Sequence, residues 1–266
     1  MIRERAKALA SLRSFDSDVF RGSEHVPQEL CNLILAFAVV FNDCRDLALW
    51  SDDLLRARPK AKRLNRYQGE HGGQTFHVIR LACGTIHELG EFIQKHSGVL
   101  NHPLFLEVLD RLPEREKEMW NAVRDLAFGK KSAKTADDLL KDLRNTTAFH
   151  YDARELAAAY DRRFPRGSND REQQPLLSLG PRVHTARFYF GDAAAATLLV
   201  QQIERRGVSE FGARFSEILA NVSVVLALIV EGFIEARSAL RDFVEDATPA
   251  GAVDDLSNAG ERDDME

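Results

Sequence analysis

Apolar residues recur at helical spacing through the segment that follows Pro27. The positions are Leu30, Leu33, Ile34, Phe37, Val40, Phe41 and Leu47. Side chains at this spacing share one face of an α-helix, and proline is well tolerated where a helix begins. The pattern predicts a long helix from about Pro27 to Leu55. The helix should end before Pro59, because the residue preceding a proline disfavours helical geometry.

Helical spacing recurs along most of the remaining chain. It predicts further helices at about 76–95, 103–110, 113–128, 136–163, 192–205 and 209–244. Strand patterns are nearly absent. The exception is "HTARFYF", residues 184–190, where clustered aromatic and β-branched residues could form a short strand. The sequence therefore predicts an all-α multi-helix bundle, with a short strand or an irregular insertion around 164–190.

Three segments lack helical spacing. "QGEHGGQ", residues 68–74, is rich in glycine, and we expect it to form a loop together with the basic residues before it. Residues 164–181 are polar and interrupted by glycine and proline. Residues 246–266 are acidic and poor in large apolar side chains, a composition typical of disorder. The predicted organisation is an N-terminal segment 1–26, one helical domain 27–245 with an insertion loop 164–181, and a disordered acidic tail 246–266.

Composition limits the cellular setting. The chain has 266 residues, of which 44% are hydrophobic, enough to bury a sizeable core. The two longest apolar runs, 31–41 and 219–234, are shorter than the roughly 20 residues of a bilayer span, and the second contains Glu231. The charged N-terminal stretch does not resemble a secretory signal. Three irregularly spaced cysteines fit a reducing compartment. We therefore expect a cytoplasmic protein with no membrane contact; the cysteines are Cys31, Cys44 and Cys83.

The net charge of −5 does not indicate a general nucleic-acid binder, but it conceals one basic segment. Residues 56–66 contain no acidic side chain and carry Arg56, Arg58, Lys60, Lys62, Arg63 and Arg66. A basic cluster of this size is most often a solvated linker. The other interpretation is a surface that attracts RNA electrostatically.

The run "DLRNTTAFHYD", residues 142–152, combines an arginine, an asparagine and a histidine within a predicted helix. A 4-3-4-3 spacing puts His150 on one stripe of that helix, which we expect to face the core or a partner helix. The stripe consists of Leu139, Leu143, Thr146, His150, Ala153, Ala157, Tyr160 and Phe164. A histidine buried in such a stripe would need hydrogen-bond partners, such as Thr146 or a carbonyl group.

The same residue types also suit phosphodiester cleavage. Arginine offers a permanently charged, forked donor set for a phosphate group. Histidine titrates near neutrality and can move a proton to or from a ribose hydroxyl. Asparagine can hold an oxygen atom without competing for that proton. His150 is therefore either a structural residue or part of an active site that needs no metal ion.

Arg144 followed by Asn145 and, four residues later, His150 resembles the arginine–polar–histidine motif of the HEPN superfamily. The resemblance implies a helical domain with the motif on a late helix. It implies that Arg144 binds the scissile phosphate, that Asn145 is the polar residue of the motif, and that His150 is the acid–base residue. Many members are metal-independent ribonucleases of toxin–antitoxin and other defence systems, acting as homodimers, so the implied partners are RNA, a second copy and an antitoxin or other protein.

Two further clusters have ordinary structural explanations. Cys83, His87 and Glu91 share a helix face but lack a second ligand cluster, so we predict no metal site and no cofactor. The aromatic run 184–190, with Arg182 and Arg187, could stack nucleic-acid bases, but its aromatic residues are more typical of a core or a dimer interface. The leading prediction is an RNA-binding or RNA-cleaving HEPN-like protein. The alternative is a non-catalytic helical module that binds a protein partner or a nucleotide.

Overall fold

The computed structural model describes residues 13–60, 65–129, 153–168, 170, 173–178, 181–182, 186–205, 211–238 and 240–242. Helices dominate this part of the chain, and the prediction of an all-α bundle is confirmed. The α-helices are α2 (Gln28–Arg56), α3 (Arg66–Lys95), α4 (Pro103–Asp110), α5 (Glu114–Ala127), α7 (Ala153–Arg163), α8 (Tyr189–Arg205) and α9 (Phe211–Arg237). Short elements are η1 (Ser17–Phe20), η2 (Ser97–Val99), β1 (Arg13–Ser14) and β2 (Arg241–Asp242).

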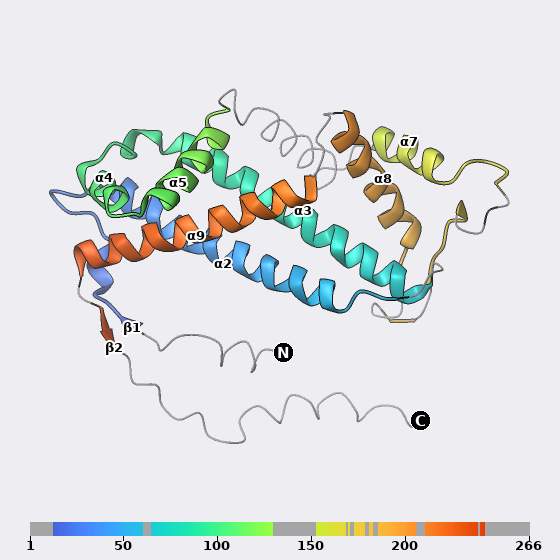
Figure 1. Ribbon diagram of the computed structural model, residues 1–266, viewed down its shortest axis with the longest axis horizontal. Coiled ribbons are helices and arrows are strands. Elements are labelled where there is room, and N and C mark those ends of the chain that lie inside the picture. Colours follow the sequence, from blue (N-terminus) through green and yellow to red (C-terminus); the bar gives the residue numbers. More distant parts are fainter. Residues whose placement is uncertain are drawn as a thin grey trace, which may run out of the picture.

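Three long helices form the centre of the molecule. α9 lies antiparallel to α2 and packs along it, while α3 returns antiparallel to α2 (Figure 1). The core between them contains fully buried side chains from both apolar runs of the sequence, including Leu33 and Phe37 of α2 and Val225 and Phe233 of α9. Burial of these side chains supplies the main driving force for folding.

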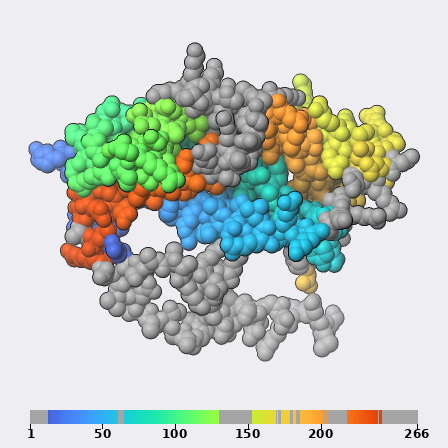
Figure 2. Space-filling view, viewed as in Figure 1, coloured from blue at the N-terminus to red at the C-terminus, as the bar shows by residue number. Residues whose placement is uncertain are grey.

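The shorter helices pack at opposite ends of this centre. α4 and α5 contact α9 at one end, and α5 also contacts α3. α7 and α8 pack against each other at the other end, where α8 contacts α3. The space-filling view shows the two pairs at opposite ends of one face (Figure 2). α7, the helix that follows the sequence motif, therefore belongs to the α3–α8 end.

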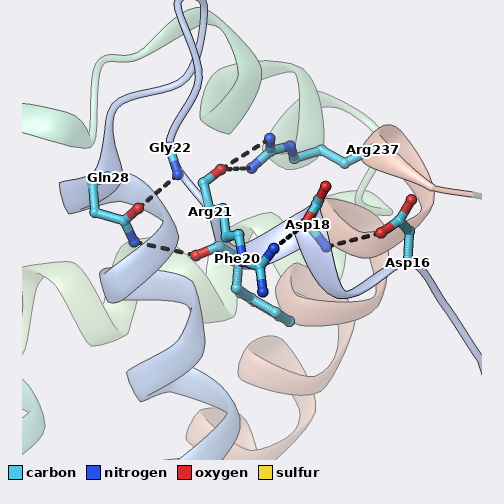
Figure 3. Close-up of polar contacts among 7 residues, drawn as sticks. All are labelled: Asp16, Asp18, Phe20, Arg21, Gly22, Gln28 and Arg237. Carbon is cyan, nitrogen blue, oxygen red and sulfur yellow. Dashed lines mark hydrogen bonds and ion pairs between the residues drawn. The ribbon is translucent and has the colours of Figure 1, made fainter.

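The chain before α2 is joined to the end of α9. β1 pairs antiparallel with β2, and the amide of Asp16 donates to Ser238 Oγ (3.1 Å). Arg237, in the last turn of α9, donates to the carbonyl oxygen of Arg21 (Figure 3). It also donates to the carbonyl oxygen of Val19. The Phe20 ring stacks on Phe233, with centroids 6.1 Å apart. Helix C-termini favour positive side chains, so the position of Arg237 also suits the helix dipole.

The prediction of a loop at residues 68–74 is wrong, because these residues lie inside α3. Asn65 caps the helix: its side-chain oxygen accepts hydrogen bonds from the amides of Tyr67 and Gln68. The helix thus begins ten residues earlier than the predicted start at Phe76, at Arg66. Glycine has a low intrinsic helix propensity, and packing against α8 overrides it here.

Of the short strand or irregular insertion predicted around 164–190, the described residues of 184–190 form no strand. Arg187 forms one isolated antiparallel bridge with Ser178, and α8 begins at Tyr189. The predicted last helix ends at Arg237 rather than near Val244, and Arg241–Asp242 forms β2. β2 pairs with β1, more than two hundred residues earlier in the chain, and local sequence patterns do not encode such pairing.

Within the described residues, one stretch has the length and composition of a membrane span. It is Ile218–Arg237 of α9, with a mean hydropathy of 2.0. Apolar side chains of this stretch, including Val222, Leu226 and Ile229, are fully buried. α9 packs against α2, α4 and α5, so these residues form part of the core in this structure.

The contacts of Arg237 give a stability prediction. Arg237→Met keeps the length of the side chain but leaves the Val19 and Arg21 carbonyls without their charged donor. The free energy of unfolding should fall by about 1–3 kcal/mol. The control is Arg111→Met, which removes one half-exposed ion pair with Glu107 and should cost at most about 0.5 kcal/mol. Equal losses in urea denaturation would contradict a special role for Arg237.

Candidate functional site

The predicted catalytic residues Arg144, Asn145 and His150 lie outside the described residues. α7 covers the later part of the helix predicted at 136–163 and starts at Ala153, three residues after His150. Its end at Arg163 agrees with the predicted helix end. The structure thus gives the surroundings of the segment that follows the motif.

The inward stripe predicted for this helix is only partly correct. Tyr160 and Phe164 pack inward, with ring centroids 5.0 Å apart, and Phe164 is buried. Ala153 and Ala157 belong to the same predicted stripe, yet both are exposed. The fully buried residue of α7 is Ala159, which directly precedes Tyr160 of the predicted stripe. Alanine side chains are too small to fix which face a helix buries, so the packing with α8 decides it.

A groove of about 400 Å³ separates α7 from α3 and the start of α8. Its wall on α7 includes Leu156, Ala157 and Tyr160, and α3 contributes Arg80. The start of α8 contributes aromatic residues: Phe188, which is 55% exposed, has its ring centroid 5.7 Å from that of Phe190. We call this feature the aromatic groove. It combines exposed aromatic faces with a guanidinium group.

Arg187 joins the start of α8 to α3. Its Nη1 donates to Glu70 Oε1 (2.9 Å), and its Nε donates to Asp192 Oδ2 (2.9 Å). Glu70 also accepts a hydrogen bond from Gln74 Nε2 (2.8 Å), so the carboxylate is held in place within α3. The Arg187 side chain is 25% exposed, and this shielding strengthens both ion pairs relative to fully exposed ones.

Glycines let α8 approach the backbone of α3. A Cβ added at Gly69 would lie 2.6 Å from the Tyr189 ring, and one at Gly73 would collide with the Arg187 guanidinium and with Asp192. Gly72 differs, because a Cβ there would meet no atom within 4 Å. Since these residues share one face of α3, two of them accommodate α8 and the third borders open space.

That open space is a cavity of about 190 Å³ between α3, the end of α7 and the start of α8. Its apolar lining includes Gly69, Gly72, Phe164, Tyr189 and Phe190. We call it the glycine cavity. Its polar lining consists of Gln68, Arg163, Gln174 and Asp192. The glycine cavity and the aromatic groove share Phe190 and Asp192, so they are neighbours.

The basic segment leads into this end of the molecule. Arg56 ends α2, where it pairs with Asp52, and Arg66 begins α3, three residues before Gly69. Arg58, Lys60 and Arg66 are exposed, and the Arg66 guanidinium lies 5.0 Å from the centre of the Tyr67 ring. Lys62 and Arg63 lie outside the described residues. The described basic side chains are therefore in contact with solvent, and Arg66 lies two residues before Gln68, which lines the glycine cavity described above.

The pKa of His77 is shifted by its partial burial and by the charged residues around it. Partial burial lowers its pKa from the usual 6.5, and the positive charges of Arg80 and Arg187 lower it further, while Asp192 opposes them. Its ring also packs edge-on to Trp50, with centroids 5.8 Å apart. His77 is therefore mostly neutral at pH 7 and reports the local charge of the groove.

The three cysteines are buried, and none of them forms a disulfide bond. Burial raises the pKa of Cys44 to about 12 and also raises the pKa of Cys83 well above its ordinary value. Because the thiolate is the reactive form, neither thiol is a nucleophile at neutral pH.

Cys83, His87 and Glu91 do not converge on a common point. Cys83 and His87 are buried, whereas Glu91 is exposed and its Oε1 lies 3.9 Å from His87 Nε2. No group of three His, Cys, Asp or Glu side chains able to hold a metal ion occurs within the described residues. The structural interpretation of Cys83 as a small buried apolar residue agrees with its position.

Sequence reasoning treated the glycine-rich stretch as a flexible turn and so missed its role in the site. A signal was present: Gly69, Gly72, Gly73, Phe76 and Arg80 follow i, i+3, i+4, i+7 and i+11 spacing. This spacing marks one helix face. The identity of the partner, the start of α8 more than one hundred residues later, had no such signal.

The chain was compared with protein-family models, with curated proteins and with solved structures. None of the three comparisons finds a match. The function proposed below is derived from the residues and geometry described above.

The three glycines give a matched stability series. Gly72→Ala should raise the free energy of unfolding by about 0.5–1 kcal/mol, because alanine is the better helix former and the added methyl group meets nothing. Gly69→Ala should lower it by about 1–3 kcal/mol, because the methyl group would overlap the Tyr189 ring. Chemical denaturation measures both. Similar changes in the two variants would rule out close packing of Tyr189 on α3.

The charge environment of His77 gives a pH prediction. Arg80→Gln should raise the pKa of His77, and Asp192→Asn should lower it. Because the pKa in the folded state is below that of the unfolded chain, His77 disfavours folding as pH falls through about 6.5 and has no such effect above it. NMR titration of the imidazole, assigned with His77→Gln, measures the shift. Movement in the same direction in both charge variants would contradict this environment.

Proposed function

We propose that the protein binds RNA at the aromatic groove and cleaves it, without a metal ion, through Arg144, Asn145 and His150. The observation that carries the proposal is the exposure of the two described stripe residues nearest to His150 in sequence, although the later stripe residues Tyr160 and Phe164 pack inward. Ala153 and Ala157 of that stripe are exposed, and Ala157 lines the aromatic groove. A structural histidine would instead belong to a buried stripe.

The groove has the chemical character of a single-stranded RNA site. Exposed aromatic rings stack on unpaired bases regardless of sequence, and arginine binds phosphate and base faces. Phe188 and Tyr160 supply rings on the two sides of the groove, and Arg80 supplies the positive charge. The exposed residues Arg58, Lys60 and Arg66 would raise the rate of RNA association, an effect that salt weakens.

The proposed reaction is attack by a ribose 2′-hydroxyl on the adjacent phosphorus. His150 takes the hydroxyl proton, the new bond from the 2′ oxygen to phosphorus forms, and the bond to the 5′ oxygen breaks. Arg144 binds the phosphate oxygens and stabilises the charge that builds on them, and Asn145 holds the ribose or phosphate by hydrogen bonds. In a homodimer, the protonated His150 of the second subunit gives its proton to the leaving 5′ oxygen. The products are a 2′,3′-cyclic phosphate and a 5′-hydroxyl end.

The test incubates the full chain with labelled single-stranded RNA in EDTA. Wild type should yield cyclic-phosphate ends, and His150→Ala should reduce the rate by about 100-fold or more without lowering stability. The matched control is His25→Ala, an exposed histidine before α2, which should keep full activity. Unchanged cleavage by His150→Ala, or no cleavage by wild type together with a less stable His150→Ala variant, would overturn the proposal.

A second candidate function, binding of a free nucleotide without catalysis, is favoured by the glycine cavity. The cavity is separate from the aromatic groove and has its own polar groups, Gln68, Gln174 and Arg163. Such a protein would bind nucleotides but leave RNA intact in the same assay.

A further inference from the structure

We propose that the glycine cavity binds a single nucleobase, presented either by a free nucleotide or by one unpaired residue of an RNA strand. The inference for RNA rests on the proposed function, whereas binding of a free nucleotide does not. The cavity lies between the glycine face of α3 and the first turn of α8, beside the aromatic groove. Its shape, its polar groups and its size each point to this occupant.

Three glycines on the α3 side of the cavity leave the helix backbone uncovered by side chains of their own. At Gly72 the α3 backbone borders empty space, since an added Cβ would meet no atom within 4 Å. The Tyr189 ring covers the neighbouring Gly69, and the Phe164 and Phe190 side chains complete the apolar lining. A backbone floor with aromatic walls favours a flat, aromatic ligand, because such a ligand can stack on the rings.

The polar groups match the edge of a base. The side-chain amide of Gln174 offers a donor and an acceptor, the combination that nucleobases present on their own edges. Asp192 uses Oδ2 for Arg187, and its other carboxylate oxygen can accept a base N–H. An apolar chain such as a lipid tail would make no hydrogen bond with either group, which disfavours it as an occupant.

A positive charge stands at the edge of the cavity. Arg163 ends α7, and its guanidinium carbon lies 5.2 Å from the centre of the Phe164 ring. A guanidinium group suits a phosphate attached to the base through its ribose. Among the residues that line the cavity, Arg163 is the one with a positively charged side chain.

The volume limits the occupant to one ring system. An apolar cavity of about 150 Å³ in a protein is known to hold benzene. The glycine cavity, at about 190 Å³, has room for a somewhat larger ring system but none for two stacked bases. Because it shares Phe190 with the aromatic groove, a base in the cavity and a base stacked on Phe188 would belong to adjacent nucleotides.

Three glycine variants separate the cavity from the groove. Gly72→Leu fills the cavity, Gly191→Leu fills the aromatic groove, and Gly98→Leu adds the same side chain in η2, far from both. A Cβ at each of the three positions meets no atom within 4 Å, so the first atom of the new side chain fits without strain. Thermal denaturation followed by circular dichroism checks the folding of each variant.

The probes are the four nucleoside 5′-monophosphates and a short single-stranded RNA, titrated calorimetrically into the full chain. Wild type should bind at least one monophosphate, and Gly72→Leu should weaken that binding at least tenfold. Gly98→Leu should bind as wild type does, and Gly191→Leu should weaken RNA binding alone. If Gly72→Leu does not fold, Gln174→Leu, at an exposed position, should weaken the monophosphate or change which base is preferred.

The outcomes separate this inference from the proposed function. Failure of wild type to bind any monophosphate, or equal binding by Gly72→Leu, would overturn the cavity assignment even if RNA is cleaved. Binding that Gly72→Leu abolishes, in a protein that leaves RNA intact, would establish the cavity and overturn the ribonuclease proposal. RNA binding that is sensitive to Gly72→Leu, together with cleavage, supports both.

Discussion

The contact between Arg187 and the glycine face of α3 determines the end of the molecule where a ligand can bind. Arg187 bonds Glu70 of α3 and Asp192 of α8 at once, so it fixes the distance between two helices far apart in the sequence. Gly73 lies directly beneath the guanidinium, and Gly69 lies beneath the neighbouring Tyr189 ring. A Cβ at either position would overlap these side chains, which would have to move. α3 and the start of α8 are in close contact at Gly69 and Gly73, whereas Gly72 borders the glycine cavity.

This end contrasts with the remainder of the bundle. The central helices α2 and α9 bury large aliphatic and aromatic side chains against each other, and Arg237 connects the last turn of α9 to the chain before α2. That part is held by apolar packing, which is non-directional and tolerant of detail. The α3–α7–α8 end uses glycine contacts, ion pairs and aromatic edges, which are directional. A division of this kind, a packed centre with a polar and partly open end, is suited to carrying a binding site on a rigid support.

The two proposals rest on different residues. The proposed cleavage rests on Arg144, Asn145 and His150, whose chemistry is read from the sequence. The proposed RNA binding rests on the aromatic groove, whose lining comes from α3, α7, α8 and the residue before α8. The proposed recognition of one base rests on the glycine cavity. Because the groove and the cavity share Phe190 and Asp192, an RNA strand could occupy both, with one base held in the cavity while its neighbour stacks outside.

The sequence by itself determined that the chain is helical, where most helices lie, and which apolar residues form the core, because helix formation leaves a periodic record along the chain. α4, for example, has the predicted bounds, and α2 differs by about one residue. The sequence also supplied the arginine–polar–histidine motif. Only the tertiary structure decided that residues 68–74 are helical, that Ala153 and Ala157 face outward, and that α8 begins at Tyr189. In each case the deciding contact joins residues distant in sequence: Gly69 with Tyr189, Glu70 with Arg187, and Tyr160 with Phe190. Local propensity is a weak preference that such contacts override, and a single sequence carries no record of which distant residues will meet.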